Sequence, residues 1–415
     1  LIPLAILLLS SSHHLFSQEL TPTDEVYEYV PGEVDWLTGE GFVIGGIVDP
    51  RFFVIGVGGV VESGSEVSDF ANGDHDPIKD LGFQAIEIAL PFNFNNGVTG
   101  LVNGTGLERE DEWEAILEEA FIHVELTDTL SVGGGLFFNT FGRQNHQHIH
   151  AWDFVNQDLV NARILNEGEL TTLGGELIAK TPGNMGVLTV AFGGVRTHGH
   201  GHDEEEEEHG HEEEEEHHEE EEEEEHHLEI DDSGFNDWVF SADYKFRPFV
   251  DDTIIVSTSV ATGENGFGRD THAFGAGIQK VFNGHDHGNG PEFCDGATLI
   301  GTEFIGRHVD YFDEEHGGES SFNDYGLSTR FLYGLDDRST IGLRHDWIGN
   351  ISAGELNVAE AHRLSAAYTI FLDPKKHLRA KIQYDYTDRA DLNGEHAAYF
   401  QLQYQWGGIG GIHNH

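Results

Sequence analysis

Short segments in which apolar and polar side chains alternate recur through most of this chain, with turn residues between them. In 396–406 one set of alternate residues is apolar, namely Ala398, Phe400, Leu402, Tyr404 and Trp406. The residues between them carry polar groups, namely Tyr399, Gln401, Gln403 and Gln405. A period of two is that of a β-strand, whose successive side chains point to opposite faces. The pattern therefore predicts an all-β fold with one apolar face on each strand.

About sixteen segments carry this pattern, at 51–61, 82–91, 97–104, 115–126, 129–140, 169–180, 186–195, 236–247, 252–262, 271–282, 297–309, 321–334, 339–348, 359–372, 377–388 and 395–406. An even number of strands is typical of bacterial single-chain barrels. A soluble sandwich would alternate as well, but the number and length of the segments, together with an N-terminal export signal, favour a membrane protein. We predict a transmembrane antiparallel β-barrel.

The connections alternate between short and long, as the periplasmic turns and outer loops of a barrel do. The short ones are rich in turn residues and lie at 127–128, 181–185, 247–252, 334–339 and 372–377. The long ones lie at 62–81, 140–168, 196–235, 263–270, 310–320, 349–358 and 388–395. This alternation puts 196–235 outside the cell. The long connection 283–296 breaks it, because it falls on the periplasmic side.

The two ends of the chain differ from the strand-rich part. Residues 1–18 contain a short apolar run followed by small residues, which predicts a secretory signal peptide. Residues 19–50 are acidic and are expected to form a periplasmic segment before the barrel at 51–406. Residues 407–415 form a glycine-rich tail that ends in histidine. No stretch reaches the roughly 20 apolar residues that a membrane-spanning helix needs.

The chain is strongly acidic, with 76 acidic against 21 basic residues and a formal net charge of −55. Such a surface attracts cations and makes nucleic acid an unexpected partner. The chain has a single cysteine, Cys294, which excludes an intramolecular disulfide and a cysteine-based zinc site. Any metal must therefore be held by histidines and carboxylates.

Residues 197–228, inside the outer connection 196–235, consist almost entirely of histidine and glutamate. The histidines are His198, His200, His202, His209, His211, His217, His218, His226 and His227. Imidazole and carboxylate are zinc ligands, so the run is predicted to collect Zn²⁺ or a similar divalent cation. Protons compete for the same imidazoles, so binding is expected to weaken below about pH 6 to 7. The alternative is a solubilising acidic tract with incidental histidines.

Two smaller groups of histidines are further metal candidates. His146, His148 and His150 share one side of an extended segment, and a short helix is expected at 158–165, as in a loop that constricts a pore. His285 and His287 lie on the periplasmic side, as do His413 and His415 in the tail. The alternative in each case is a set of loop histidines that only make hydrogen bonds.

Charged residues of both signs are predicted to line the lumen of the barrel, namely Asp243, Lys245, Glu303, Arg307, Arg330, Arg344, Asp346, Arg363, Arg379, Lys381 and Asp385. Facing acidic and basic walls create a transverse field, and lumen charge tunes selectivity. The alternative is that these charges pair and fill the lumen. No serine-based motif, HExxH motif or glycine-rich phosphate loop is present, so we expect no enzymatic activity.

The stretch from Phe141 to Pro182 resembles a known family. It carries a histidine pair before two aromatic residues, a Leu-Val-Asn-Xxx-Arg segment and a Gly-Xxx-Glu-Leu segment before a proline, here His148, His150, Trp152, Phe154, Leu159–Arg163, Gly175–Leu177 and Pro182. Residues 261–266 and the histidine-ended tail are also similar. The family consists of porin-like outer-membrane barrels described as zinc-regulated, or as TonB-dependent receptors that lack a plug. The resemblance implies a porin-type barrel whose expression or cargo is tied to zinc.

These observations predict a porin-like channel in the outer membrane of a Gram-negative bacterium. It would concentrate a divalent metal, zinc in the first place, and admit it by passive diffusion, with no tightly bound cofactor. Two alternatives stay open, namely a non-conducting surface barrel that sequesters metal or mediates adhesion, and a general small-solute porin with an incidental acidic loop. The expected partners are outer-membrane lipid and divalent metal ions. Porin-like barrels are often trimers, so a homotrimer is a further expectation.

Overall fold

A computed structural model gives the fold of the chain. It describes residues 47–61, 75–77, 81–94, 97–109, 112–181, 185–196, 230–248, 253–283, 296–313, 317–354, 356–373, 376–390 and 394–407. The predicted signal peptide, most of the predicted periplasmic segment and nearly all of the tail lie outside these residues, so those predictions stay predictions.

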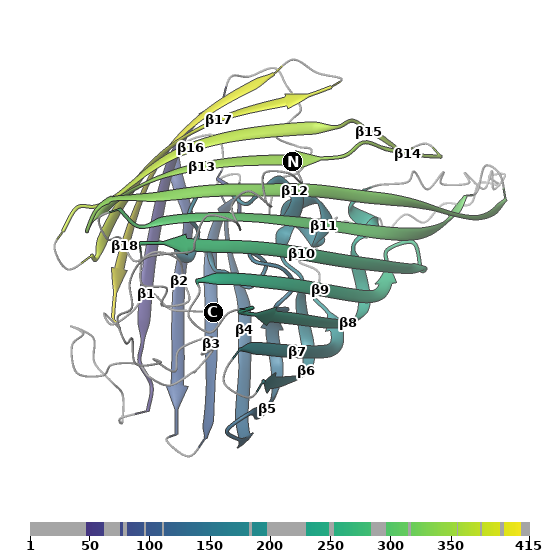
Figure 1. The fold of residues 1–415 in the computed structure, drawn as a ribbon, viewed down its shortest axis with the longest axis horizontal. Helices are drawn as coiled ribbons and strands as arrows, with labels where there is room; N and C mark the ends of the chain where they lie inside the picture. Colours follow the sequence, from purple (N-terminus) through teal and green to yellow (C-terminus); the bar gives the residue numbers. More distant parts are fainter. Residues whose placement is uncertain are drawn as a thin grey trace, which may run out of the picture.

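The described residues form a closed antiparallel β-barrel of sixteen strands (Figure 1). The strands are β1 (Arg51–Val61), β2 (Leu81–Asn93), β3 (Val98–Arg109), β4 (Glu112–Thr127), β5 (Leu130–Phe138), β6 (Thr171–Lys180), β7 (Gly186–Val195), β8 (Phe235–Phe246), β9 (Ile254–Asn265), β10 (Asp270–Phe282), β11 (Thr298–Asp313), β12 (Gly318–Asp336), β13 (Ser339–Ile348), β16 (Ala361–Phe371), β17 (Leu378–Arg389) and β18 (Glu395–Trp406). A separate hairpin, β14 (Ile351–Ala353) and β15 (Leu356–Val358), lies in the β13–β16 connection. The predicted fold class is confirmed.

The barrel closes where the first strand pairs with the last. β1 pairs antiparallel with β18, from Phe52 opposite Trp406 to Val61 opposite Ala397, and Figure 1 shows the purple and yellow strands side by side. Each remaining barrel strand pairs with the barrel strands that precede and follow it in the chain, with β13 paired to β16 across the separate hairpin. Closure leaves no unpaired strand edge, which is the condition for a sheet to span a bilayer.

The predicted alternation becomes an outer apolar surface and an inner polar one. On β18 the side chain of Phe400 is 50% exposed while its neighbours Gln401 and Gln403 are buried. On β17 the side chain of Ile382 is 58% exposed and that of Lys381 is 1% exposed. An apolar surface around a closed barrel is the lipid contact of an outer-membrane protein. The chain is therefore an outer-membrane β-barrel.

The helices of the structure are short. No helix in the described part of the chain has the length and apolar composition needed to cross a membrane.

Most strand boundaries agree with the prediction, and the long connection at 283–297 does lie at the barrel end that carries the short turns. The main difference concerns β11 and β12, which extend to Asp313 and begin at Gly318, so most of the loop predicted at 310–320 belongs to strands. The extension is stabilised by an apolar cluster of Tyr311 and Phe322 with residues of the β14–β15 hairpin.

The β5–β6 connection, residues 139–170, folds into the barrel, and we call it the lumen loop. It contains the short helix α2 (Leu159–Ile164) and two 3₁₀ turns, η2 (Ile149–Ala151) and η3 (Asn166–Gly168). Asp158 caps α2, because its carboxylate accepts a hydrogen bond from the Asn161 backbone N–H at 2.8 Å. The helix predicted for a constricting loop is thus present.

Apolar side chains fasten the lumen loop to the wall. Residues of α2, among them Leu159 and Ile164, pack with Ile305 of β11 and Ile348 of β13. At the opposite side of the barrel, Trp152 packs with a cluster on β1 to β4. These contacts place the loop across the lumen, where its polar groups meet those of the wall.

Candidate functional site

The lumen loop makes one circuit of the inner wall. Its contacts follow the order of the strands around the barrel, with His148 on β4, His150 on β2, Trp152 on β17, Asn156 on β13, Arg163 on β12 and Asn166 on β8. The two ends of the loop also bond to each other, since the Asn145 side chain donates to the backbone oxygen of Leu170 at 3.1 Å. The loop therefore contacts strands on all sides of the lumen.

Basic residues gather on the wall formed by β11 to β17. The Arg344 guanidinium donates to the backbone and side-chain oxygens of Asn156 at 2.9 and 2.6 Å. The Lys381 ammonium donates to the backbone oxygens of Trp152 and Phe154 at 2.9 and 3.0 Å. These bonds use the cations of the wall to hold the irregular backbone of the loop, whose carbonyls have no strand partner.

Carboxylates on the same wall pair with these cations. Asp346 lies 3.1 Å from both Arg344 and Arg363, and its carboxylate accepts a hydrogen bond from the Leu159 backbone N–H. Asp324 pairs with Arg307 at 3.1 Å and with Arg163 of the loop. The ion pairs therefore join strand to strand and wall to loop.

All residues predicted to line the lumen lie on the inward face. Most of them are buried under the lumen loop, namely Asp243, Glu303, Arg307, Arg330, Arg344, Asp346, Arg363, Lys381 and Asp385. Lys245 and Arg379 are half-buried. The wall charges thus meet the loop more than they meet open water.

Glutamates and histidines gather on the opposite side, on β2 to β6 and the nearby loop. His148 lies between two carboxylates, with Nδ1 2.9 Å from Glu118 and Nε2 2.8 Å from Glu119. A carboxylate only accepts hydrogen bonds, so both ring nitrogens donate and the ring is charged. Burial alone would lower the pKa of His148, but hydrogen bonds to both glutamates and their negative charges outweigh it and raise the pKa well above 6.5.

His150 of the predicted trio pairs with a different glutamate. His150 bonds to Glu87 through Nδ1 and stacks on Phe53, with ring centroids 3.9 Å apart. The rings of His148 and His150 are stacked with centroids 5.8 Å apart. His146 is half-buried. The sequence placed all three together as metal ligands, and the structure pairs two of them with separate carboxylates.

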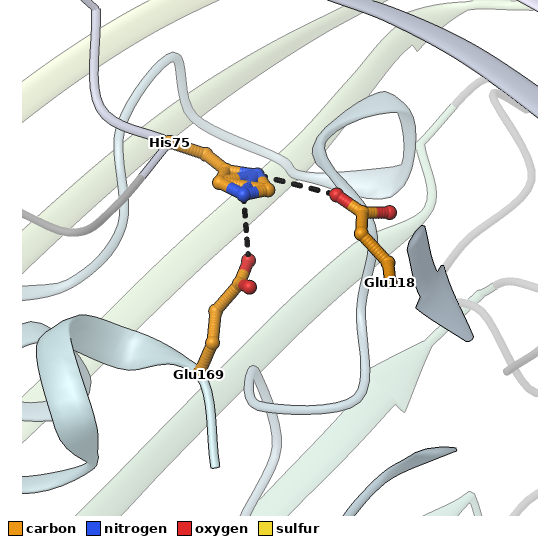
Figure 2. A group of neighbouring side chains, drawn as sticks. All are labelled: His75, Glu118 and Glu169. Carbon is orange, nitrogen blue, oxygen red and sulfur yellow. Dashed lines mark ion pairs between the residues drawn. The ribbon is translucent and has the colours of Figure 1, made fainter. Parts of the chain in front are cut away.

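A different trio lies within ligand distance of one another, formed by His75, Glu118 and Glu169 (Figure 2). One ligand atom from each lies within 4.8 Å of the other two, which among the described residues defines this group as able to hold a metal ion. His75 Nδ1 is 3.6 Å from Glu118 and Nε2 is 3.3 Å from Glu169. One imidazole and two carboxylates are donors that suit zinc and related divalent cations.

Sequence reasoning missed this trio because its members are far apart in the chain. His75 comes from the β1–β2 connection, Glu118 from β4 and Glu169 from the end of the lumen loop. Neither residue spacing nor composition marks them. The only related signal was the short helix expected at 158–165, which is typical of a loop that constricts a pore.

The other predicted metal ligands lie outside the described residues. These are His198, His200, His202, His209, His211, His217, His218, His226 and His227 of the histidine/glutamate run, His285 and His287 of the β10–β11 connection, and the two histidines of the tail. Their role as ligands stays a prediction.

Known structures with a similar fold are outer-membrane proteins. An OmpF structure from Salmonella typhi in complex with daunomycin aligns with a TM-score of 0.56 and 10% sequence identity, covering 86% of this chain and 97% of that one. DcaP of Acinetobacter baumannii, an outer-membrane channel, aligns with a TM-score of 0.53 and 10% sequence identity, covering 88% of this chain and 99% of that one. OmpT of Vibrio cholerae aligns with a TM-score of 0.52 and 9% sequence identity, covering 88% of this chain and 100% of that one. At these identities the likeness shows the fold, which is that of the porin-like barrels.

Sequence comparison adds no family. No protein-family model matches the chain. No curated protein matches it either.

Proposed function

We propose that this chain is a porin-like channel that admits divalent metal cations, with zinc as the first candidate, by passive diffusion through the outer membrane. The observation that carries the proposal is the division of charge inside the barrel. Glu87, Glu118, Glu119 and Glu176 lie on the β2–β6 wall. On the β11–β17 wall the basic residues outnumber the carboxylates, with Arg307, Arg330, Arg344, Arg363, Arg379 and Lys381 against Glu303, Asp324, Asp346 and Asp385.

Such a division creates a field across the lumen that orders a charged solute on its way through. Cations follow the acidic wall, whose carboxylates attract them. The acidic outer run at 197–228 raises the local cation concentration at the entrance, since a strongly negative surface attracts counter-ions. The two parts together support entry of a divalent cation rather than of an anionic solute.

The path through the barrel is narrow. The lumen loop contacts the wall on all sides, and its water-accessible residues are few, among them Arg143, His146, Gln147 and Asp153. We therefore expect a smaller single-channel conductance than that of a barrel whose inner loop lies against one wall only.

The first experiment is conductance of the purified protein in a planar bilayer, with Zn²⁺ titrated on the side of the histidine/glutamate run. We expect stable channels of small conductance whose current responds to micromolar zinc, and a chain lacking 197–228 that keeps the channel but loses the response. Channels indifferent to zinc would leave a general small-solute porin. Absence of channels would contradict the proposal.

The absence of channels would favour a second function, a surface barrel that sequesters metal without conducting it. The extent of contact between the lumen loop and the wall is the observation that supports this alternative. Zinc binding by intact cells that is lost when 197–228 is deleted, without any channel activity, is the result that this second function predicts.

We further propose that the barrel forms a homotrimer. Small residues reduce the lipid-facing surface of the first strands, since Gly56, Gly58, Gly104 and Gly106 alternate with inward residues on β1 and β3. A flat surface allows close approach of a second copy. One of the OmpT structures with the same fold is described as a trimer form.

A further inference from the structure

Three segments of the chain meet at His75, Glu118 and Glu169, as Figure 2 shows. The segments are residues 75–77 of the β1–β2 connection, strand β4, and the end of the lumen loop just before β6. We propose that the three side chains bind one divalent metal ion of the zinc class, and that this ion fastens the lumen loop to the wall. The site would bind an ion whether or not the barrel conducts ions.

Neighbouring side chains orient Glu118 toward the site. Glu118 uses Oε2 to accept hydrogen bonds from Asn103 at 3.0 Å and from His148 at 2.9 Å, and its Oε1 is the atom that faces His75. Oε2 is therefore held in place by its neighbours, and Oε1 is directed at the site. Outer groups that orient a ligand in this way are a general feature of metal centres.

Burial adds a reason for a cation at this position. The side chains of His75, Glu118 and Glu169 are 1%, 2% and 7% exposed. Two buried carboxylates flank one imidazole here, and buried carboxylates are stabilised by paired charges or by a metal ion. A divalent ion would add positive charge next to both carboxylates.

The distances are compatible with a small adjustment on binding. A tetrahedral zinc with ligands at about 2.0–2.2 Å separates its ligand atoms by about 3.4 Å. The ligand atoms of the trio now lie within 4.8 Å of one another, with Glu118 facing Nδ1 and Glu169 facing Nε2 of His75. Side-chain rotations that bring both carboxylates to one ring nitrogen would close the site. Three protein ligands leave the fourth position to a water molecule or an exchanging solute ligand.

Glu169 lies where a bound ion would restrain the lumen loop. Glu169 follows η3, and its neighbour Leu170 bonds to Asn145 at the other end of the lumen loop. An ion held by Glu169 therefore ties both ends of the loop to β4 and to the β1–β2 connection. Occupancy of the site should stabilise the position in which the loop crosses the lumen.

The direct test is anomalous diffraction at the zinc absorption edge from crystals of the full chain soaked in zinc chloride. A site-specific method is needed because the run at 197–228 also offers ligands. We expect an anomalous peak about 2.0–2.2 Å from one His75 nitrogen and from oxygens of Glu118 and Glu169. The proposal is overturned if zinc is found elsewhere on the chain and this position shows no peak.

Variants test the link between the ion and the loop. In hydrogen exchange with zinc at ten times its dissociation constant, amides of 166–170 should exchange about tenfold more slowly, as for a ligand that binds only the closed state. His75→Ala and the isosteric Glu169→Gln should abolish this zinc effect. The matched control is Glu360→Gln, because Glu360 forms a glutamate–histidine pair away from the acidic wall, with His362 of β16 at 3.0 Å.

The outcomes separate this proposal from the proposed function. Zinc protection that persists in both His75→Ala and Glu169→Gln, or that disappears equally in Glu360→Gln, would show that the trio does not hold the ion. Channel conductance plays no part in either result. If one variant fails to fold, the anomalous peak in the natural chain still decides.

Discussion

His148 presents both ring nitrogens to buried carboxylates, so pH acts on the lumen loop through this residue. The raised pKa fixes the direction of the effect. Below pH 6.5, the ordinary value, the imidazolium is formed in the docked and undocked loop alike, and its two ion pairs contribute fully. As the pH rises through the higher pKa of the docked state, this contribution is lost. The loop should therefore dock most firmly in mildly acidic conditions.

We predict that amides of 147–151 lose protection as the pH rises above the neutral range, after correction for the intrinsic exchange rate and without added zinc. Hydrogen exchange measured by mass spectrometry gives the pH profile. His148→Gln keeps a hydrogen-bonding side chain but cannot titrate, so its profile should be flat. An equal pH dependence in His148→Gln would assign the effect to another group.

At the scale of elements, Asp346 of β13 connects two arginines of the wall with the start of α2. Removing the carboxylate leaves Arg344 and Arg363 buried without their shared anion. Breaking a buried ion pair in this way costs about 3–5 kcal/mol. Part of that cost falls on the loop, because Leu159 loses its acceptor.

We predict that Asp346→Ala loosens the lumen loop, with faster hydrogen exchange at 159–165 and a larger, noisier single-channel current. The control is Asp310→Ala, since Asp310 lies in an exposed pair with His308 at 3.4 Å. An exposed pair contributes about 0–1 kcal/mol, so this control should leave both measurements unchanged. Equal effects of the two substitutions would mean that Asp346 does not fasten the loop.

The strands were predictable because their alternation is a local property of the sequence. β1, β7, β13 and β18 begin and end where the pattern predicted. The helix in the lumen loop was also predictable, since its capping aspartate is local. The path of the loop around the wall was not, because its partners, such as Gln383 and Asp385 for residues 155 and 156, are more than two hundred residues away. The trio at His75 was hidden for the same reason.

At the scale of the whole molecule, the outward glycines of β1 and β3 predict assembly. A Cβ added at Gly56 meets only atoms 3.9 Å away, so a larger side chain there is tolerated by the barrel itself. We predict that Gly56→Trp abolishes a trimer without unfolding the protein. Light scattering in detergent gives the mass, and resistance to unfolding in cold detergent shows that the barrel is intact.

The control introduces the same large side chain on the opposite side of the barrel. Ala276 is an exposed outward residue of β10, and Ala276→Trp should leave the trimer in place. A monomeric natural protein, or a trimer that survives Gly56→Trp, would contradict the assignment of this face.

The lumen loop starts from β5 and returns to β6, two strands that are paired with each other. Glycines with positive φ stand near both ends, Gly142 at 66° and Gly168 at 98°. The loop is therefore joined covalently to the barrel at one place only, between two paired strands, and its sequence can change without breaking the strand pairing of the barrel. The width of the path through the barrel then depends on the lumen loop. Insertions, deletions or substitutions in the lumen loop can therefore change the permeability of the barrel while its sixteen strands keep their pairing.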